Sequence, residues 1–139
     1  MGLPVLFEVL RDDLDDKEIV KAALEVLLVS VMPANNNVAS QAGVVNGELV
    51  VRNQDQVSMV LGLLEDDDFY LRYHTLQFLT ALLKTAGPRL QEVILTSPMG
   101  VARLMDMLME REVIRNEALL LLIALAKDNE SLQKIIVFE

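Results

Sequence analysis

Two runs of acidic residues are the part of this chain best suited to chemistry. The first covers 12–16 (Asp-Asp-Leu-Asp-Asp) and the second covers 65–68 (Glu-Asp-Asp-Asp). A calcium loop places its ligands in a fixed rhythm, with a glycine at the sharp turn and a distal bidentate glutamate. Neither run has that rhythm, so we expect no metal site. We interpret both runs as turns that begin helices, where aspartate caps free N–H groups and complements the helix dipole.

His74 is the only histidine, and a catalytic role would require a nucleophile or an oriented carboxylate beside it. Its sequence neighbours Arg72 and Tyr73 would lie on other faces of a helix. The sequence contains no cysteine, no G-x-S-x-G motif, no glycine-rich phosphate loop and no metal-ligand spacing. We therefore predict a structural histidine, no enzymatic activity and no cofactor.

Composition excludes two further classes of function. The 139 residues include 21 acidic and 12 basic side chains, for a net charge of −9. Nucleic-acid binding depends on clustered lysine and arginine, so no nucleic-acid partner is expected. The longest apolar run, 118–126, is about half the length of a membrane span, so direct membrane insertion is not expected either. A hydrophobic content of 53% is enough for a sizeable core.

A repeated apolar stripe determines the predicted fold. Stripes that begin at Ile19, Leu71 and Ile114 continue at the fourth, fifth and eighth following positions, so they recur after 52 and then 43 residues. A second pattern at 90–95 recurs 42 residues later at 132–137. Helical units with a period near 40 to 47 residues are typical of armadillo and HEAT solenoids. The prediction is an all-α, right-handed, armadillo-like α-solenoid of about three repeats.

The longer first interval predicts an insertion. Proline, asparagine and glycine in 33–54 are turn formers, so we expect one long loop there, with a short strand-like piece at 49–51. The chain would form a single helical domain over 1–139, as a fragment of a longer solenoid. Its repeats would cover 2–32, 55–86 and 87–127, and a further repeat would start at 131–139.

Specific strings add a family resemblance to this pattern. The layout of 100–108 and 113–122 looks like an armadillo repeat. The strings at 11–27 (RDDLDDKEIVKAALEVL), 95–108 (LTSPMGVARLMDML), 111–125 (REVIRNEALLLLIAL) and 132–139 (LQKIIVFE) resemble the globular armadillo-repeat head of the general vesicular transport factors. These are Golgi vesicle-tethering golgins, and the plant-type homologues look closest.

The resemblance implies a cytoplasmic protein, peripheral on Golgi membranes, that works in vesicle tethering during ER-to-Golgi and intra-Golgi transport. It implies protein partners: a Rab GTPase, other golgins and the SNARE machinery. The full-length family members act as parallel homodimers through a coiled coil, and no sustained heptad pattern occurs in this chain. This segment would then be a non-catalytic protein-interaction scaffold. The alternative is an unrelated armadillo-repeat adaptor, for example in ubiquitination or cytoskeletal attachment.

Armadillo proteins that bind extended peptides carry asparagines on their long helices. The equivalent positions here are Val29, Ala81 and Ala124, which offer no amide, so we do not expect an extended-peptide ligand. Arg72 and Arg115 occupy equivalent positions and are candidate partner-binding residues, unless they pair with the neighbouring acidic turns. Met109 is a third candidate, because Met105 and Met107 lie closer to the apolar face of their helix.

Overall fold

A computed structural model describes residues 2–32, 41–97 and 99–138, and these residues form helices and turns without a strand. The helices are α1 (Gly2–Asp12), α2 (Lys17–Val31), α3 (Gln41–Val51), α4 (Gln54–Gly62), α5 (Phe69–Thr96), α6 (Gly100–Asp106), α7 (Glu112–Ala126) and α8 (Glu130–Phe138). Short 3-10 turns, η1 (Leu63–Glu65) and η2 (Met107–Met109), extend α4 and α6. The predicted all-α fold is confirmed.

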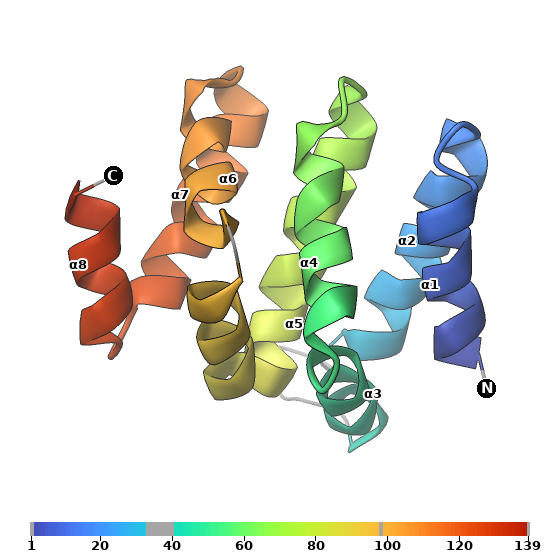
Figure 1. The fold of residues 1–139 in the computed structure, drawn as a ribbon, viewed down its shortest axis with the longest axis horizontal. Coiled ribbons are helices and arrows are strands. Elements are labelled where there is room, and N and C mark those ends of the chain that lie inside the picture. Colours follow the sequence, from blue (N-terminus) through green and yellow to red (C-terminus); the bar gives the residue numbers. More distant parts are fainter. Residues whose placement is uncertain (1, 33–40, 98, 139) are drawn as a thin grey trace.

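The helices stack along one axis in two layers. The long helices α2, α5 and α7 form one layer, the shorter α1, α4 and α6 form the other, and the two chain ends lie at opposite ends of the stack (Figure 1). The helix α5 packs against both α2 and α7. Each element therefore contacts mainly its neighbours along the axis, which is the organisation of an α-solenoid. The division into repeats at particular residues stays a prediction.

Two of the three long helices begin at an aspartate cap. Asp16 accepts a hydrogen bond from the backbone N–H of Ile19 at 3.3 Å, and Asp68 accepts one from Leu71 at 3.1 Å. Each cap satisfies one of the donors that a helix start leaves unpaired. The sequence interpretation of the acidic runs as helix starts is confirmed at both positions.

The helix α5 contains a break at Ala86. Ala86 has φ −143° and ψ 42°, outside the helical region, and Gly87 and Pro88 follow it. Proline lacks the N–H that helix propagation needs, but it fits the first turn of a new helix. The second part of α5 therefore starts as a new helical segment after Ala86.

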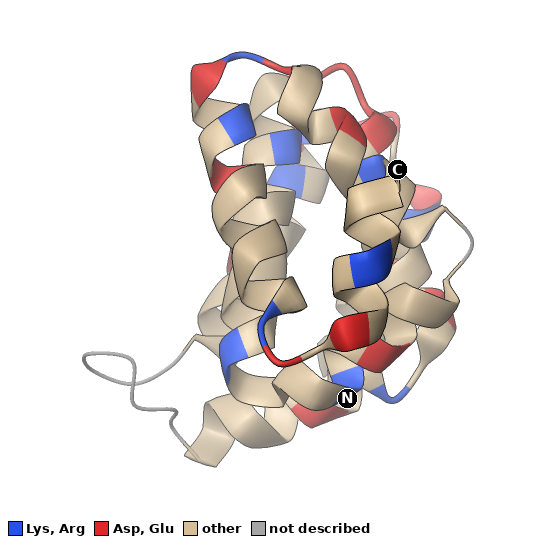
Figure 2. Ribbon diagram, turned by 90° about the vertical axis from the view of Figure 1, so that its left-hand side faces the viewer, with Lys and Arg blue, Asp and Glu red and all other residues tan. Residues whose placement is uncertain are grey.

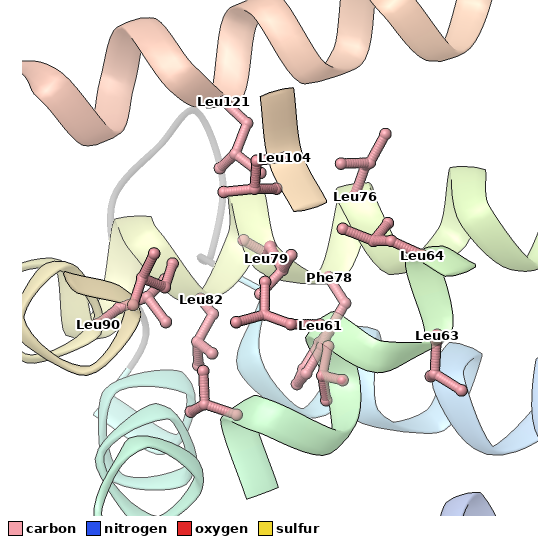
Figure 3. Close-up of a cluster of buried hydrophobic side chains, with 14 of the residues drawn as sticks. Leu61, Leu63, Leu64, Leu76, Phe78, Leu79, Leu82, Leu90, Leu104 and Leu121 are labelled. Atoms are coloured by element: carbon pink, nitrogen blue, oxygen red, sulfur yellow. The ribbon is translucent and has the colours of Figure 1, made fainter. Parts of the chain in front are cut away.

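Leucine side chains fill the space between the layers. Leu61 and Leu64 point from the short-helix layer toward Leu76 and Leu79 of α5, and Phe78 lies in the same cluster (Figure 3). These side chains are at most 1% exposed. Full burial of a side chain of this size contributes about 1.5–3 kcal/mol relative to leaving it in water, so this cluster helps to hold the two layers together.

The prediction of a long loop over 33–54 is wrong for its second half. Residues 41–51 form α3, the expected strand-like piece at 49–51 is helical, and 33–40 lie outside the described residues. The turn formers have another role here: Gly43 and Gly47, one turn apart, are buried in α3, and Asn46 Nδ2 donates to the carbonyl of Ser30 at 2.8 Å. Small residues let two helix backbones approach closely. In the sequence alone, glycines used in this way cannot be told apart from glycines that form a turn.

Substituting Gly47 with alanine tests that close approach. A Cβ at this position would lie 2.6 Å from Oγ1 of Thr85, so Gly47→Ala forces α3 and α5 apart. We expect a loss of about 1–3 kcal/mol from overpacking, reduced by up to about 1 kcal/mol of helix propensity. Urea unfolding followed by circular dichroism measures this difference.

The same substitution in a Thr85→Ala background should cost little, because the obstructing oxygen is gone. Gly62→Ala is the matched control, since a Cβ there has no neighbour within 4 Å. An equal cost of Gly47→Ala in both backgrounds would contradict the proposed contact.

Candidate functional site

Two ion pairs link the turn at 65–68, which precedes α5, to the neighbouring long helix α2. Lys17 donates from Nζ to a carboxylate oxygen of Asp66, and Lys21 Nζ lies 3.5 Å from Oδ2 of Asp68. Both lysines are on α2, so each ion pair crosses from one long helix to the turn before the next. Figure 2 shows acidic residues gathered at the end of the helices where these turns lie.

Both carboxyl groups are held in their charged form. Burial raises the pKa of Asp66, but the hydrogen bonds from Lys17 and from the backbone N–H of Asp68 outweigh it, so the pKa lies below its usual value. The backbone N–H of Leu71 lowers the pKa of Asp68 in the same way, with Lys21 adding to the effect. These groups are therefore structural anions, and the described residues contain no group of acidic or histidine side chains that could hold a metal ion.

Arg72 performs the same linking role between α5 and α7. Its Nη1 donates to the carbonyl of Asp66 at 2.7 Å, and its Nη2 lies 3.5 Å from Oε2 of Glu110 in the turn before α7. The side chain is only 13% exposed. The structure thus matches the alternative interpretation of Arg72, intramolecular pairing, and leaves little of it for a partner.

The other two candidate residues are exposed. Arg115 is the fourth residue of α7, as Arg72 is of α5, but its side chain has no ion pair among the described residues. Met109, in η2, is 89% exposed, whereas Met107 is buried and Met105 is partly buried. Both Arg115 and Met109 remain predictions as partner-binding residues.

His74 lines a shallow hollow of about 320 Å³ between α2 and α5. Its Nε2 lies 3.9 Å from Oε1 of Glu25, and its buried Nδ1 has no hydrogen-bond partner. Lys21 and Tyr70 also face the hollow. It contains no serine, threonine or cysteine that the imidazole could activate, so its geometry gives no support for nucleophilic chemistry.

The open surface of the long-helix layer carries apolar side chains. Leu120 and Ile123 of α7 are 61% and 67% exposed. Their equivalents on α5, Gln77 and Thr80, stay partly exposed although α5 is covered on both sides. Stacking of helices therefore covers these two positions only in part, so Leu120 and Ile123 lie on a surface that keeps some exposure beside a stacked neighbour.

The positions equivalent to a peptide-gripping asparagine do not form a uniform row. Val29 and Ala124 are exposed, but Ala81 is buried. The apolar residues in that row leave no side-chain amide to bind a peptide backbone.

Leu120 and Ile123 were not among the residues predicted from the sequence, because they lie within the continuous apolar run 118–126. Their positions beside the buried stripe of α7, rather than on it, are the feature of the sequence that could have identified them as exposed.

Comparisons with known proteins give consistent relatives. The chain is 52% identical over 142 residues to golgin candidate 6 of Arabidopsis thaliana, covering 99% of the chain and 16% of that protein. It is 42% identical over 143 residues to general vesicular transport factor p115 of Homo sapiens, covering 96% of the chain and 15% of that protein. The chain thus spans about one sixth of the length of these relatives. No protein-family model matches it.

Solved structures support the fold. Two crystal structures of Uso1, designated Uso1-1 and Uso1-2, superpose with TM-scores of 0.86 and 0.88 over 99% of this chain, at 24% and 23% sequence identity. The chain covers 25% and 24% of those two structures. The predicted armadillo-like α-solenoid is therefore confirmed as a fold class. No helix in the described part of the chain is long and apolar enough to cross a membrane.

The lowered pKa values predict how stability depends on pH. The stabilisation from Asp66 and Asp68 is complete above their usual value of 3.8 and is lost as the pH falls through their lower folded-state values. A variant with Asp66→Asn and Asp68→Asn should be less stable than the wild type near neutral pH. The difference should shrink below about pH 4. Urea unfolding at a series of pH values measures it.

Asparagine also caps helices, so the double variant removes charge while keeping the cap at Asp68. Asp67→Asn is the control for overall loss of charge, because Asp67 is exposed and has no hydrogen bond or ion pair among the described residues. A stability difference that stays constant down to pH 2 would rule out the lowered values as its cause.

Arg72 and Arg115 form a matched pair for a test of the linking role. Arg72→Met keeps the aliphatic stem but removes the contacts with Asp66 and Glu110, and should cost about 1–3 kcal/mol. Arg115→Met should change the free energy of unfolding by no more than about 0.5 kcal/mol, because its guanidinium is exposed. Chemical denaturation compares the two, and equal costs would contradict the assignment.

Proposed function

Because the chain is homologous over nearly its whole length to golgin candidate 6 and the general vesicular transport factors p115 and Uso1, we propose that it is a protein-interaction scaffold in vesicle tethering. The observation that carries the proposal is the identity of 42–52% over 96–99% of the chain. The proposed setting is ER-to-Golgi and intra-Golgi transport, in the cytoplasm and peripheral on Golgi membranes. This homology favours a transport function over an unrelated armadillo adaptor in ubiquitination or cytoskeletal attachment.

The scaffold acts without catalysis. Its only histidine faces a hollow with no side chain to activate, and the acidic residues Asp66 and Asp68 are engaged in caps and ion pairs. This segment covers about one sixth of the length of its relatives, and their other parts can have other activities. The proposal therefore concerns this segment alone. Its proposed partners are folded proteins: a Rab GTPase, other golgins or the SNARE machinery, with a homodimer in the full-length context.

The open apolar surface of α7 is the proposed contact region. Leu120 and Ile123 lie one helical turn apart, so their side chains share a face. Helix stacking reduces their exposure without removing it, since their equivalents on α5, Gln77 and Thr80, are half-buried rather than buried. An exposed apolar patch without an intramolecular role is typical of a protein-binding site.

A segment exchange tests the function. Human cells depleted of p115 receive p115 in which the homologous segment is replaced by this chain, and arrival of a secretory reporter at the Golgi is timed. We expect the exchanged protein to restore transport and a version without the segment to fail. Leu120→Asp with Ile123→Asp should slow transport several-fold while leaving the helical fold intact.

Leu28 is the equivalent of Ile123 on α2, but Leu28→Asp is unsuitable as a control because that side chain packs on the core. Val5→Asp is suitable, since Val5 is exposed on α1, away from α7. Equal transport with and without the segment would refute a role for it in tethering. A double variant that binds and transports normally would refute only the assigned surface.

A further inference from the structure

A groove opens between α1 and α4 in the short-helix layer. The two helices are neighbours in that layer (Figure 1), and the groove between them has a volume of about 390 Å³. It is on a different surface from Leu120 and Ile123, which lie on the long-helix layer. Five of the residues that line it are apolar or glycine: Leu10, Leu14, Met59, Gly62 and Leu63.

Both walls of this groove are in place within the stack. The helix α1 contacts α4 directly, and each helix in a solenoid packs mainly on its neighbours, so a helix added at either end of the stack would lie outside this gap. Leu14 is 40% exposed on one wall, and Met59 is half-buried on the other. Apolar surface therefore stays open here although both neighbours are present.

The next gap in the same layer is bridged by a long side chain. Arg103 of α6 donates from Nε to Oε1 of Glu65 in η1 at 3.0 Å, and only 23% of its side chain is exposed. Val60 of α4 precedes Arg103 by 43 residues, the interval that separates the stripes of α5 and α7, and it is buried. The position that bridges the gap between α4 and α6 is thus taken on α4 by a side chain that cannot span the groove beside α1.

Gly62 lines the groove without a structural need for glycine. Its φ of −62° and ψ of −26° are ordinary helical values, and a Cβ there has no neighbour within 4 Å. Glycine in a helical conformation is less favourable than alanine because it loses more conformational freedom on folding. Neither the backbone conformation nor close packing accounts for Gly62, whereas a large side chain at this position would extend into the groove.

The charges beside the groove leave a negative excess. Leu14 stands between Asp13 and Asp15, and Asp67 follows the second acidic lining residue; these three exposed side chains have no hydrogen bond or ion pair among the described residues. Each lies one residue from a residue of the groove, well within a Debye length of about 8 Å. The charged residues of the lining itself are neutralised in the pairs Arg11–Asp12, Lys17–Asp66 and Arg103–Glu65.

We propose that this groove docks a partner protein through a segment that carries a large apolar side chain next to lysine or arginine. The apolar side chain enters the space beside Gly62, and the basic side chains lie against Asp13, Asp15 and Asp67. The volume is at the small end of the range of binding pockets, so it fits one or two side chains of such a segment. The same carboxylates repel nucleic acid and anionic membranes.

Selection of random peptides displayed on phage tests this proposal, with the whole chain as bait. Phage that bind the wild type are kept, and those that also bind Gly62→Leu are removed. We expect the remaining peptides to carry leucine, methionine or phenylalanine beside lysine or arginine. A synthetic copy of one such peptide should bind Gly62→Leu at least about tenfold more weakly in fluorescence anisotropy, because the leucine fills its site. Its affinity for the wild type should fall as NaCl is raised.

Two controls separate a blocked groove from a damaged fold. Gly62→Ala should bind nearly as the wild type, because one methyl group leaves the groove open, and urea unfolding should show no loss of stability in either Gly62 variant. Asp13→Asn with Asp15→Asn should weaken binding several-fold. Glu48→Gln with Asp128→Asn removes the same charge from exposed residues outside the groove and should not weaken it.

Three outcomes would overturn the proposal. The first is that no selected peptide depends on Gly62. The second is that the peptides which do depend on it are acidic or lack a large apolar residue. The third is that the two pairs of charge variants weaken binding equally. None of these outcomes bears on the transport assay, because the groove and the α7 surface are on different layers.

Discussion

No helix in this structure can bury its apolar face without a neighbour along the stack. The helix α5 shows the constraint in full: its stripe is buried on one side by α2 and on the other by α7, and Leu71, Leu76 and Leu79 are fully buried as a result. Burial of this kind, rather than helix propensity, supplies most of the stability of helices of this length. The caps, turns and ion pairs then determine the register in which these long helices pack.

The acidic turns fix that register because they act in two directions at once. Asp68 caps α5 through Leu71 and also approaches Lys21 of α2, and Asp66 joins Lys17 to Arg72. An apolar stripe tolerates small slips between helices, but a hydrogen-bonded carboxylate does not. The paired acidic residues in these turns thus have a structural explanation.

The sequence predicts the helices whose apolar residues recur with a helical period. It does not predict α3, in which small residues recur at that spacing instead. The apolar stripe that begins at Ile114 lies within α7, so the sequence does predict this helix. The helix α3 was missed because Gly43, Asn46 and Gly47 favour turns locally. Their helical conformation depends on contacts with Ser30 and Thr85, which no local pattern reveals.

The candidate site shows the same limit. Arg72 and Arg115 occupy equal positions in similar helices, so no argument from sequence separates a buried link from an exposed side chain. The difference arises from Glu110, which stands in a turn beside Arg72 and has no counterpart near Arg115 among the described residues. Exposure in a solenoid is thus a property of a position and of what is stacked beside it. The α5 equivalent of Leu120, Gln77, is partly exposed beside both neighbours, whereas the equivalent of Leu119, Leu76, is fully buried. A binding surface on this fold is therefore defined by the rows that stacking leaves at least partly exposed.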